Sequence, residues 1–221
     1  FLQRAGAPAP VRLLQAGDPV PGFPGSSADL VLYARAINAS GEVRFEAEFY
    51  LGRTIKHAIL GYQGGTFRTI AYSDDIAPGT SGAQFGRATT LIGFTAAGDT
   101  MFRASLVPSV QPPLPSRYTI FLAPASGPTV RLVGEGDGAP GTAGGTLSQI
   151  SSVGFNEQSE VLFTAAIVGG PGGYGLFVAS TSGVRKIVAN GDLDPAGGTF
   201  SWTTSSFAAG INNAGQVAFL Y

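Results

Sequence analysis

The sequence predicts an all-β protein built from four-stranded repeat units, and three observations support this. Gly and Pro account for 33 and 15 of the 221 residues, yet 44% of the residues are hydrophobic. Such a composition is typical of many short apolar strands separated by many turns. No stretch keeps a helical period with capping residues, so we expect almost no helix. Two short motifs also recur four times in fixed register.

The first motif is a turn followed by a strand that has Phe at its centre. Its copies begin 57, 61 and 56 residues apart and are "NASGEVRFEA" (38–47), "TAAGDTMFRA" (95–104), "NEQSEVLFTA" (156–165) and "NNAGQVAFLY" (212–221). A turn leading into an alternating apolar strand predicts a β-hairpin. We therefore expect four aromatic rings to be buried at equivalent places, namely Phe45, Phe102, Phe163 and Phe219.

The second motif is a loop centred on aspartate that lies upstream of each turn. Its copies are "AGDPVPG" (16–22), "SDDIAPG" (73–79), "EGDGAPG" (135–141) and "NGDLDPAGG" (190–198). The aspartate precedes the first residue of the turn motif by 20, 20, 19 and 20 residues. Two motifs that hold this register over four copies indicate a true internal repeat.

Each repeat divides into four short strands, and four-stranded units of this length are typical of a β-propeller. The units are anchored at 38–94, 95–155 and 156–211, within a single all-β repeat domain of residues 1–221. Residues 1–37 and 212–221 together supply one more blade, in which Gln216–Tyr221 pairs with Leu2–Ala5 and closes a four-bladed ring. The alternatives are part of a longer propeller or an open repeat array. If the terminal strands pair between molecules, a homo-oligomer or filament results.

The repeat resembles the tandem "NxxGxxAF" repeat of exported bacterial proteins and, more weakly, the repeats of TolB-type propellers. Asn38, Gly41 and Phe45 match the pattern, whereas Thr95 and Ser159 depart from it. The resemblance covers nearly the whole chain. It implies a propeller-like fold and a secreted or cell-surface location, and it leaves the function open.

The aspartate loops raise the question of a calcium site, since carboxylates and glycine-rich turns supply oxygen ligands. The best candidates are Asp74, Asp75, Asp137, Asp192 and Asp194. Most loops offer only one or two carboxylates, however, and an aspartate in every repeat also suits a turn cap that accepts backbone N–H bonds. We therefore predict turn capping without a metal, and no cofactor.

Charged residues on the Phe-centred strands are the candidate binding residues. Arg44 and Glu46 share one face of their strand, opposite Phe45, and Arg103 lies at the position of Glu46 in the next repeat. Such a face points to a neighbouring blade or an axial channel, and a structural ion pair or a ligand site would both explain it. His57 is the only histidine and is expected on the solvent side of a strand; no G-x-S-x-G motif accompanies it.

Charge and composition exclude several classes of function. The net charge is −1 and only 12% of residues are charged, so no basic surface for nucleic acid is expected. There is no cysteine, and no apolar run is long enough for a membrane-inserted helix. We expect a non-enzymatic extracellular or cell-surface module for binding or self-assembly. The alternative is a propeller-type hydrolase or lyase with its site at the channel mouth.

Overall fold

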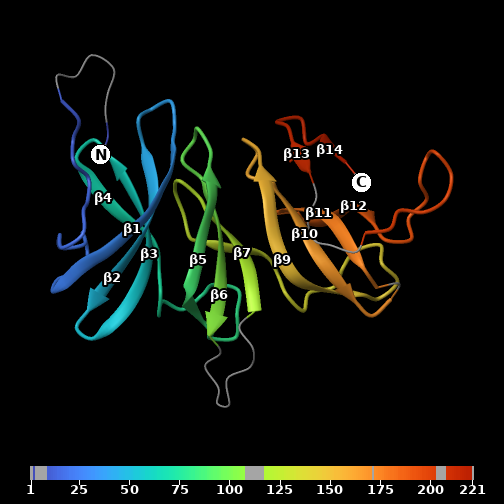
Figure 1. Cartoon of the computed structure of the whole chain (residues 1–221), viewed down its shortest axis with the longest axis horizontal. Coiled ribbons are helices and arrows are strands. Elements are labelled where there is room, and N and C mark those ends of the chain that lie inside the picture. Colours follow the sequence, from blue (N-terminus) through green and yellow to red (C-terminus); the bar gives the residue numbers. More distant parts are fainter. Residues whose placement is uncertain (1, 3–8, 108–116, 171, 203–207, 221) are drawn as a thin grey trace.

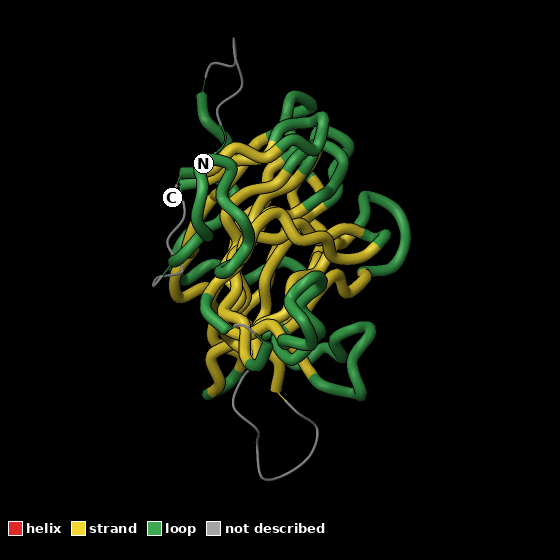
Figure 2. Tube along the Cα trace, turned by 90° about the vertical axis from the view of Figure 1, so that its right-hand side faces the viewer, coloured by secondary structure: helices red, strands yellow, loops and turns green. Residues whose placement is uncertain are grey.

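The computed structural model describes residues 2, 9–107, 117–170, 172–202 and 208–220, with only the backbone at 30–35 and 88. The described part of the chain consists of fourteen strands joined by loops and is all-β (Figure 2). It contains no helix long and apolar enough to cross a membrane. The proline-rich segment "PSVQPPLPSR" (108–117), which its composition predicts to be a surface excursion, lies almost entirely outside the described residues.

The first two four-stranded sheets are antiparallel meanders in which each strand pairs with the next along the chain. Sheet 1 has the order β1-β2-β3-β4 and sheet 2 the order β5-β6-β7-β8. The strands of sheet 1 are β1 (Ser26–Ile37), β2 (Val43–Leu51), β3 (Thr54–Gln63) and β4 (Thr66–Tyr72). Those of sheet 2 are β5 (Gln84–Phe94), β6 (Thr100–Val107), β7 (Arg117–Ala123) and β8 (Val130–Gly134).

Sheet 3 repeats the meander, and two short strands form a fourth sheet. Sheet 3 comprises β9 (Thr146–Phe155), β10 (Val161–Val168), β11 (Tyr174–Ser180) and β12 (Gly183–Ala189). Sheet 4 comprises β13 (Ala209–Ile211) and β14 (Val217–Phe219). The first strand of each large sheet pairs with interruptions in register, which are β-bulges that bend it.

The hydrogen-bonded sheets are offset by one strand from the repeat units counted from the turn motif. The unit at 38–94 contributes β2, β3 and β4 to sheet 1, but its last strand, β5, opens sheet 2. The unit at 95–155 likewise ends in β9, the first strand of sheet 3. Each sequence repeat therefore links two neighbouring sheets covalently.

Sheets 1, 2 and 3 lie in a row along the longest axis of the molecule, in the order of the sequence, and sheet 4 lies beside sheet 3 (Figure 1). The first strand of each sheet contacts the preceding sheet, as β5 contacts β3 and β13 contacts β9. Apolar clusters fill the spaces between consecutive sheets; one joins Ile59 of sheet 1 to Phe102 of sheet 2, and another joins Met101 to Phe163. The core is thus divided into layers between sheets.

The four repeat phenylalanines occupy equivalent places, each facing the sheet or segment that precedes it. Phe45, Phe102 and Phe163 are buried, with 2%, 0% and 0% of their surface exposed. Phe102 and Phe163 stack on the cross-strand Phe121 and Phe177 with similar geometry. The fourth ring, in sheet 4, is only half-buried. Burial of the first three confirms the register of the repeat.

The predicted closure of the ring is not confirmed by the described part of the chain. Among the described residues, β14 pairs with β13, and Leu2 forms an antiparallel bridge with Val11. Residues 3–5 and 221, which complete the predicted terminal strands, lie outside the described part. Among the described residues, no strand of sheet 4 pairs with a strand of sheet 1.

Candidate functional site

The four turns that precede the Phe-centred strands form the most regular polar feature of the molecule. We call them the Asn turns: residues 38–42, 95–99, 156–160 and 212–216. In each, the N–H of the first residue donates to the carbonyl of the fifth, at 2.9–3.1 Å. The fourth residue adopts a positive φ in every copy. Glycine fills this position in three turns, and Ser159, with φ of 58°, fills it in the third.

Asparagine suits the first position because its side chain completes the turn. The Oδ1 of Asn156 accepts hydrogen bonds from the N–H groups of Gln158 and Glu160, at 3.1 and 3.0 Å. Its Nδ2 donates to the Glu160 carboxylate at 2.7 Å. Asn38 and Asn212 make the same set of contacts. The repeat motif is therefore an Asx turn in which the Asn side chain also donates to the carboxylate or amide of the fifth residue.

Consecutive Asn turns are joined into a row by hydrogen bonds. Asn38 Nδ2 donates to the carbonyl of Ala96 at 3.4 Å, in the second turn. The N–H of Ala96 donates to Glu157 of the third turn at 2.8 Å. Asn156 Nδ2 donates to the carbonyl of Asn212 in the fourth turn at 3.0 Å. The turns thus hold sheets 1 to 4 in register along one edge of the array.

A pocket of about 330 Å³ lies beside this row, between sheets 1 and 2. The first two Asn turns contribute Ser40, Glu42, Ala96 and Ala97 to its wall. The β3–β4 hairpin contributes residues 61–68, and Ala125 closes the far side. The wall therefore combines a carboxylate, a guanidinium, neutral polar groups and one aromatic ring, Phe67.

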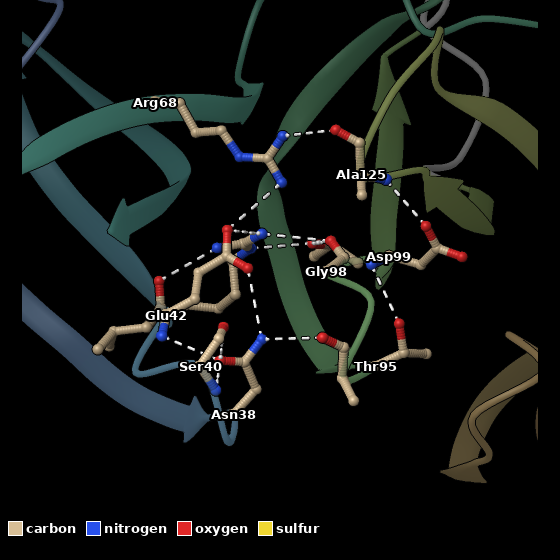
Figure 3. A network of polar contacts seen from close by, with 12 residues as sticks. Asn38, Ser40, Glu42, Arg68, Thr95, Gly98, Asp99 and Ala125 are labelled. Carbon is tan, nitrogen blue, oxygen red and sulfur yellow. Dashed lines mark hydrogen bonds and ion pairs between the residues drawn. The ribbon is translucent and has the colours of Figure 1, made fainter. Parts of the chain in front are cut away.

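Two arginines meet the single carboxylate of this pocket (Figure 3). Buried Arg44 binds Glu42 with 2.6 Å between Nη2 and Oε1, whereas the half-exposed Arg68 lies 3.9 Å from the same oxygen. Arg68 also donates to the carbonyl of Ala125 at 3.3 Å. Burial lowers the pKa of Arg44 below its ordinary value; Glu42 opposes this shift, and the charge of Arg68 adds to it.

A second pocket, of about 600 Å³, occupies the equivalent place between sheets 3 and 4. Glu160 and Arg185 stand at the positions of Glu42 and Arg68, with 3.8 Å between carboxylate and guanidinium. Arg185 donates to the carbonyl of Gly215 in the next Asn turn at 2.9 Å. The position of Arg44 is taken here by the apolar Leu162, so this pocket has one described arginine for its glutamate.

Sheet 2 carries a different arrangement at the same register. Asp99 replaces the glutamate and Val130 replaces the arginine. The Asp99 carboxylate instead accepts hydrogen bonds from the N–H of Ala125 and the hydroxyl of Ser159, at 2.8 and 2.9 Å. The opposite-charge pair is thus present beside sheets 1 and 3. Beside sheet 2 it is replaced by the hydrogen bonds of Asp99 to Ala125 and Ser159.

The predicted binding residues all contact the next sheet. Arg44 donates to Thr100 at 3.0 Å and lies over the ring of Phe94. Glu46 accepts from the N–H of Leu91 at 2.7 Å. Arg103 reaches sheet 3, where it donates to the carbonyl of Ile150 at 3.0 Å, and its guanidinium lies over the ring of Tyr118.

Of these three, only Arg44 forms an ion pair with a residue that lines the pocket described above. Its carboxylate partner is Glu42, the last residue of the first Asn turn. Glu46 and Arg103 take part in sheet-to-sheet contacts elsewhere along the strands.

Two of the aspartate loops share a capping geometry. Asp137 accepts from the N–H of Gly134 at 2.9 Å and from Arg131 at 2.7 Å. Asp192 accepts from the N–H of Ala189 at 2.8 Å and from Lys186 at 2.6 Å. In both loops the N–H donor lies three residues earlier and the basic side chain six residues earlier. The carboxylates therefore fix the end of one sheet before the chain enters the next.

The remaining metal candidates are dispersed. Asp74 forms an ion pair with Lys56. Partial burial raises the pKa of Asp75, and the charge of Asp74 adds to this rise. Asp194 accepts from the N–H of Ala196 at 2.8 Å. Within the described residues, no three His, Asp or Glu side chains gather where they could hold a metal ion.

His57 is half-buried rather than fully exposed on its strand. Its Nε2 lies 2.7 Å from the carboxylate of Glu48, its cross-strand neighbour. Burial lowers the pKa of His57 although Glu48 acts to raise it, and Arg87 adds to the lowering. The Ser73 hydroxyl oxygen accepts a hydrogen bond from the backbone N–H of His57. Ser73 and His57 are therefore not arranged as a nucleophile–base pair.

Sequence reasoning missed Arg68 and Arg185. Their signal was present, since they follow the asparagine of their Asn turn by 30 and 29 residues. The two sequence motifs recur in all four repeats, whereas these arginines recur in only two of them.

Comparisons with curated proteins and with solved structures find no match. A family match extends over residues 2–221, and thus over all the sheets described above. The chain belongs to the family of unknown function DUF7453.

Proposed function

We propose that this chain is a non-enzymatic repeat module that binds a partner through the row of Asn turns, outside the cytoplasm. The observation that carries the proposal is the recurrence of one pocket design at two places. Glu42 with Arg68 and Glu160 with Arg185 hold nearly the same separation, 3.9 and 3.8 Å. Both pairs border a pocket on the same edge of the array.

The rigidity of this edge supports a binding role. Each pocket is bounded by two Asn turns whose backbones are fixed by their own side chains and by each other. A site assembled before the ligand arrives loses little conformational entropy on binding. Polar groups in a fixed concave wall are the usual basis of ligand orientation and specificity.

The proposal includes propeller-type packing of the sheets. Each four-stranded sheet covers the next with its apolar face, and the aromatic rings of successive repeats fill the same layer. The closed ring and the longer repeat array remain the two forms of this hypothesis. Small-angle X-ray scattering distinguishes them, because an open row has a larger maximum dimension than a ring of the same sheets.

The extracytoplasmic location rests on composition and resemblance. The chain contains no cysteine and few charges. Its Asn turns resemble the repeat of exported bacterial proteins. Detection of the native protein in the extracellular or surface fraction of the producing cell tests this part of the proposal.

The binding role is tested with the purified chain immobilised and exposed to an array of soluble polysaccharides and peptides. We expect retention of at least one ligand class and recovery of that ligand unchanged. Release of new reducing ends or amines from the bound ligand would instead support the hydrolase or lyase alternative. Light scattering on the same sample reports self-assembly.

Variants connect retention to the pockets. Glu42→Gln combined with Glu160→Gln removes both carboxylates from the pocket walls, so a neutral or basic ligand should bind more weakly and an acidic ligand more tightly. Asp29→Asn, an exposed strand carboxylate outside the described linings, is the matched control and should bind normally. Equal binding by all three proteins would contradict a role for the turn row.

A further inference from the structure

We infer that the pocket between sheets 1 and 2 binds a carboxylated sugar unit, with Arg68 as the group that receives the carboxylate. This inference rests on the proposed binding role of the turn row and assigns a ligand class to one of its two pockets. Its basis is the imbalance of charge around Glu42 and the neutral polar groups beside it.

Glu42 is already neutralised by Arg44. The 2.6 Å contact joins them inside the wall, and the Arg44 side chain is fully buried. Arg68 is 43% exposed and lies 3.9 Å from the same carboxylate, beyond hydrogen-bond distance. The two described arginines and Glu42 together have a net charge of +1. Arg68 places this charge at the pocket surface.

An arginine placed in this way prefers a carboxylate. The guanidinium offers several N–H donors in a planar fork that matches two carboxylate oxygens. Arg68 commits one nitrogen to the carbonyl of Ala125 at 3.3 Å, which fixes the orientation of the fork. Gly61 permits the close approach of the two arginines, since a Cβ at this position would lie 2.8 Å from Arg44 Nη1.

The rest of the wall suits the hydroxyl groups of a sugar. Ser40, Gln63 and Thr66 supply neutral donors and acceptors on the open side of the pocket. The ring of Phe67 lies at the same wall and is held against Tyr62, with 4.9 Å between ring centroids. An aromatic face beside polar groups accommodates the apolar C–H face of a pyranose while its hydroxyls are hydrogen-bonded.

The second pocket provides the internal comparison. Glu160 and Arg185 balance each other, and Leu162 stands where sheet 1 has the second arginine. Its described lining contains no aromatic side chain. The same backbone design without the extra charge should therefore have no preference for an acidic sugar.

The inference is tested by isothermal titration calorimetry, in which the folded chain is titrated separately with galacturonic acid, its neutral methyl ester and inorganic sulfate. We expect the acid to bind about tenfold or more tightly than the ester, and Arg68→Gln to remove that difference. Arg53→Gln, at an exposed arginine outside both described pocket linings, is the matched control and should leave it intact. Gln63→Glu tests the site independently, because it adds a negative charge at an exposed hairpin residue and should abolish binding of the acid.

Several outcomes would overturn the inference. They would not decide whether the row of Asn turns binds a partner, which the ligand array tests separately. Equal affinity for acid and ester would remove the role of Arg68. Sulfate or an aspartate dipeptide binding as tightly as the acid would exclude a sugar-specific site. No detectable binding of the acid at millimolar concentration would overturn it directly.

Discussion

The carboxylate of Glu46 in sheet 1 accepts a hydrogen bond from the backbone N–H of Leu91 in sheet 2, at 2.7 Å. Leu91 lies next to a β-bulge, where the ladder between β5 and β6 changes register. A bulge releases backbone groups from regular pairing, and a buried N–H then needs another acceptor. Glu46, only 7% exposed, supplies that acceptor from the neighbouring sheet.

Removing this carboxylate should destabilise the array. We expect Glu46→Ala to lower the free energy of unfolding by about 1–3 kcal/mol, the usual cost of leaving a buried polar group unsatisfied. Glu46→Gln should cost less, because its amide oxygen can still accept from Leu91. Urea denaturation of the three proteins checks this order, and equal stability of wild type and Glu46→Ala would contradict it.

Deleting a repeat phenylalanine should have an effect that depends on its sheet. Phe163 is fully buried and stacks on Phe177 with 5.5 Å between ring centroids. Phe163→Ala should therefore cost about 3–5 kcal/mol. Phe219, which is half-buried in the short sheet 4, is the matched control and should lose less on the same change. A larger loss at Phe219 than at Phe163 would contradict the packing described here.

The repeat could be predicted because its signals are local. Asn156 and its counterparts specify a turn through hydrogen bonds within five residues, and the following Phe marks the buried strand. The assignment of strands to sheets was harder to predict from the sequence. Strand β5 continues the unit of β4 in sequence but pairs with β6. Which neighbour a strand joins depends on contacts between sheets, which no single repeat contains.

The candidate site was predictable only in part, for a similar reason. Arg44 was identified as a charged residue on a Phe-centred strand, but its partner was not, since Glu42 occupies a turn position that is polar in every repeat. Arg68 belongs to a different strand, and only the pairing of β2 with β3 and of β3 with β4 brings it to Glu42. Ring closure stays a prediction, because a count of strands contains no information on their curvature.

The aspartate loops provide a test of backbone conformation. The residue before the aspartate has a positive φ, 85° at Gly191, and a Cβ there would meet no other atom within 4 Å. Gly191→Ala should therefore cost about 1–2 kcal/mol through backbone strain alone. Gly138→Ala is the matched control, because that glycine is equally open but lacks a positive φ. Comparable losses at both positions would argue against strain as the cause.

The same loops allow the calcium hypothesis to be tested. Asp137 accepts from the N–H of Gly134 and from Arg131, and both bonds are made by the protein itself. We expect a chelator to leave the melting temperature unchanged. Asp137→Asn should cost at most about 1 kcal/mol, because the amide keeps an acceptor and the lost ion pair is partly exposed. A fall in melting temperature on chelation, reversed by added calcium, would favour a metal site.

His57 offers a direct reading of local electrostatics, because it is the only histidine in the chain. Burial lowers its pKa below the ordinary value of 6.5, Glu48 opposes the shift and Arg87 adds to it. A base whose pKa is lower in the folded state takes up its proton more readily when unfolded. This group therefore decreases the stability of the fold as the pH falls below 6.5.

The imidazole signals of His57 in an NMR titration should accordingly report a pKa below 6.5. Glu48→Gln should lower it further, since the carboxylate 2.7 Å from Nε2 is what stabilises the charged form. Arg87→Ala should raise it, because the exposed cation disfavours a second positive charge nearby. These two changes act in opposite directions on one measured value. A rise in the pKa of His57 in Glu48→Gln would contradict the stabilisation of the charged imidazole by Glu48.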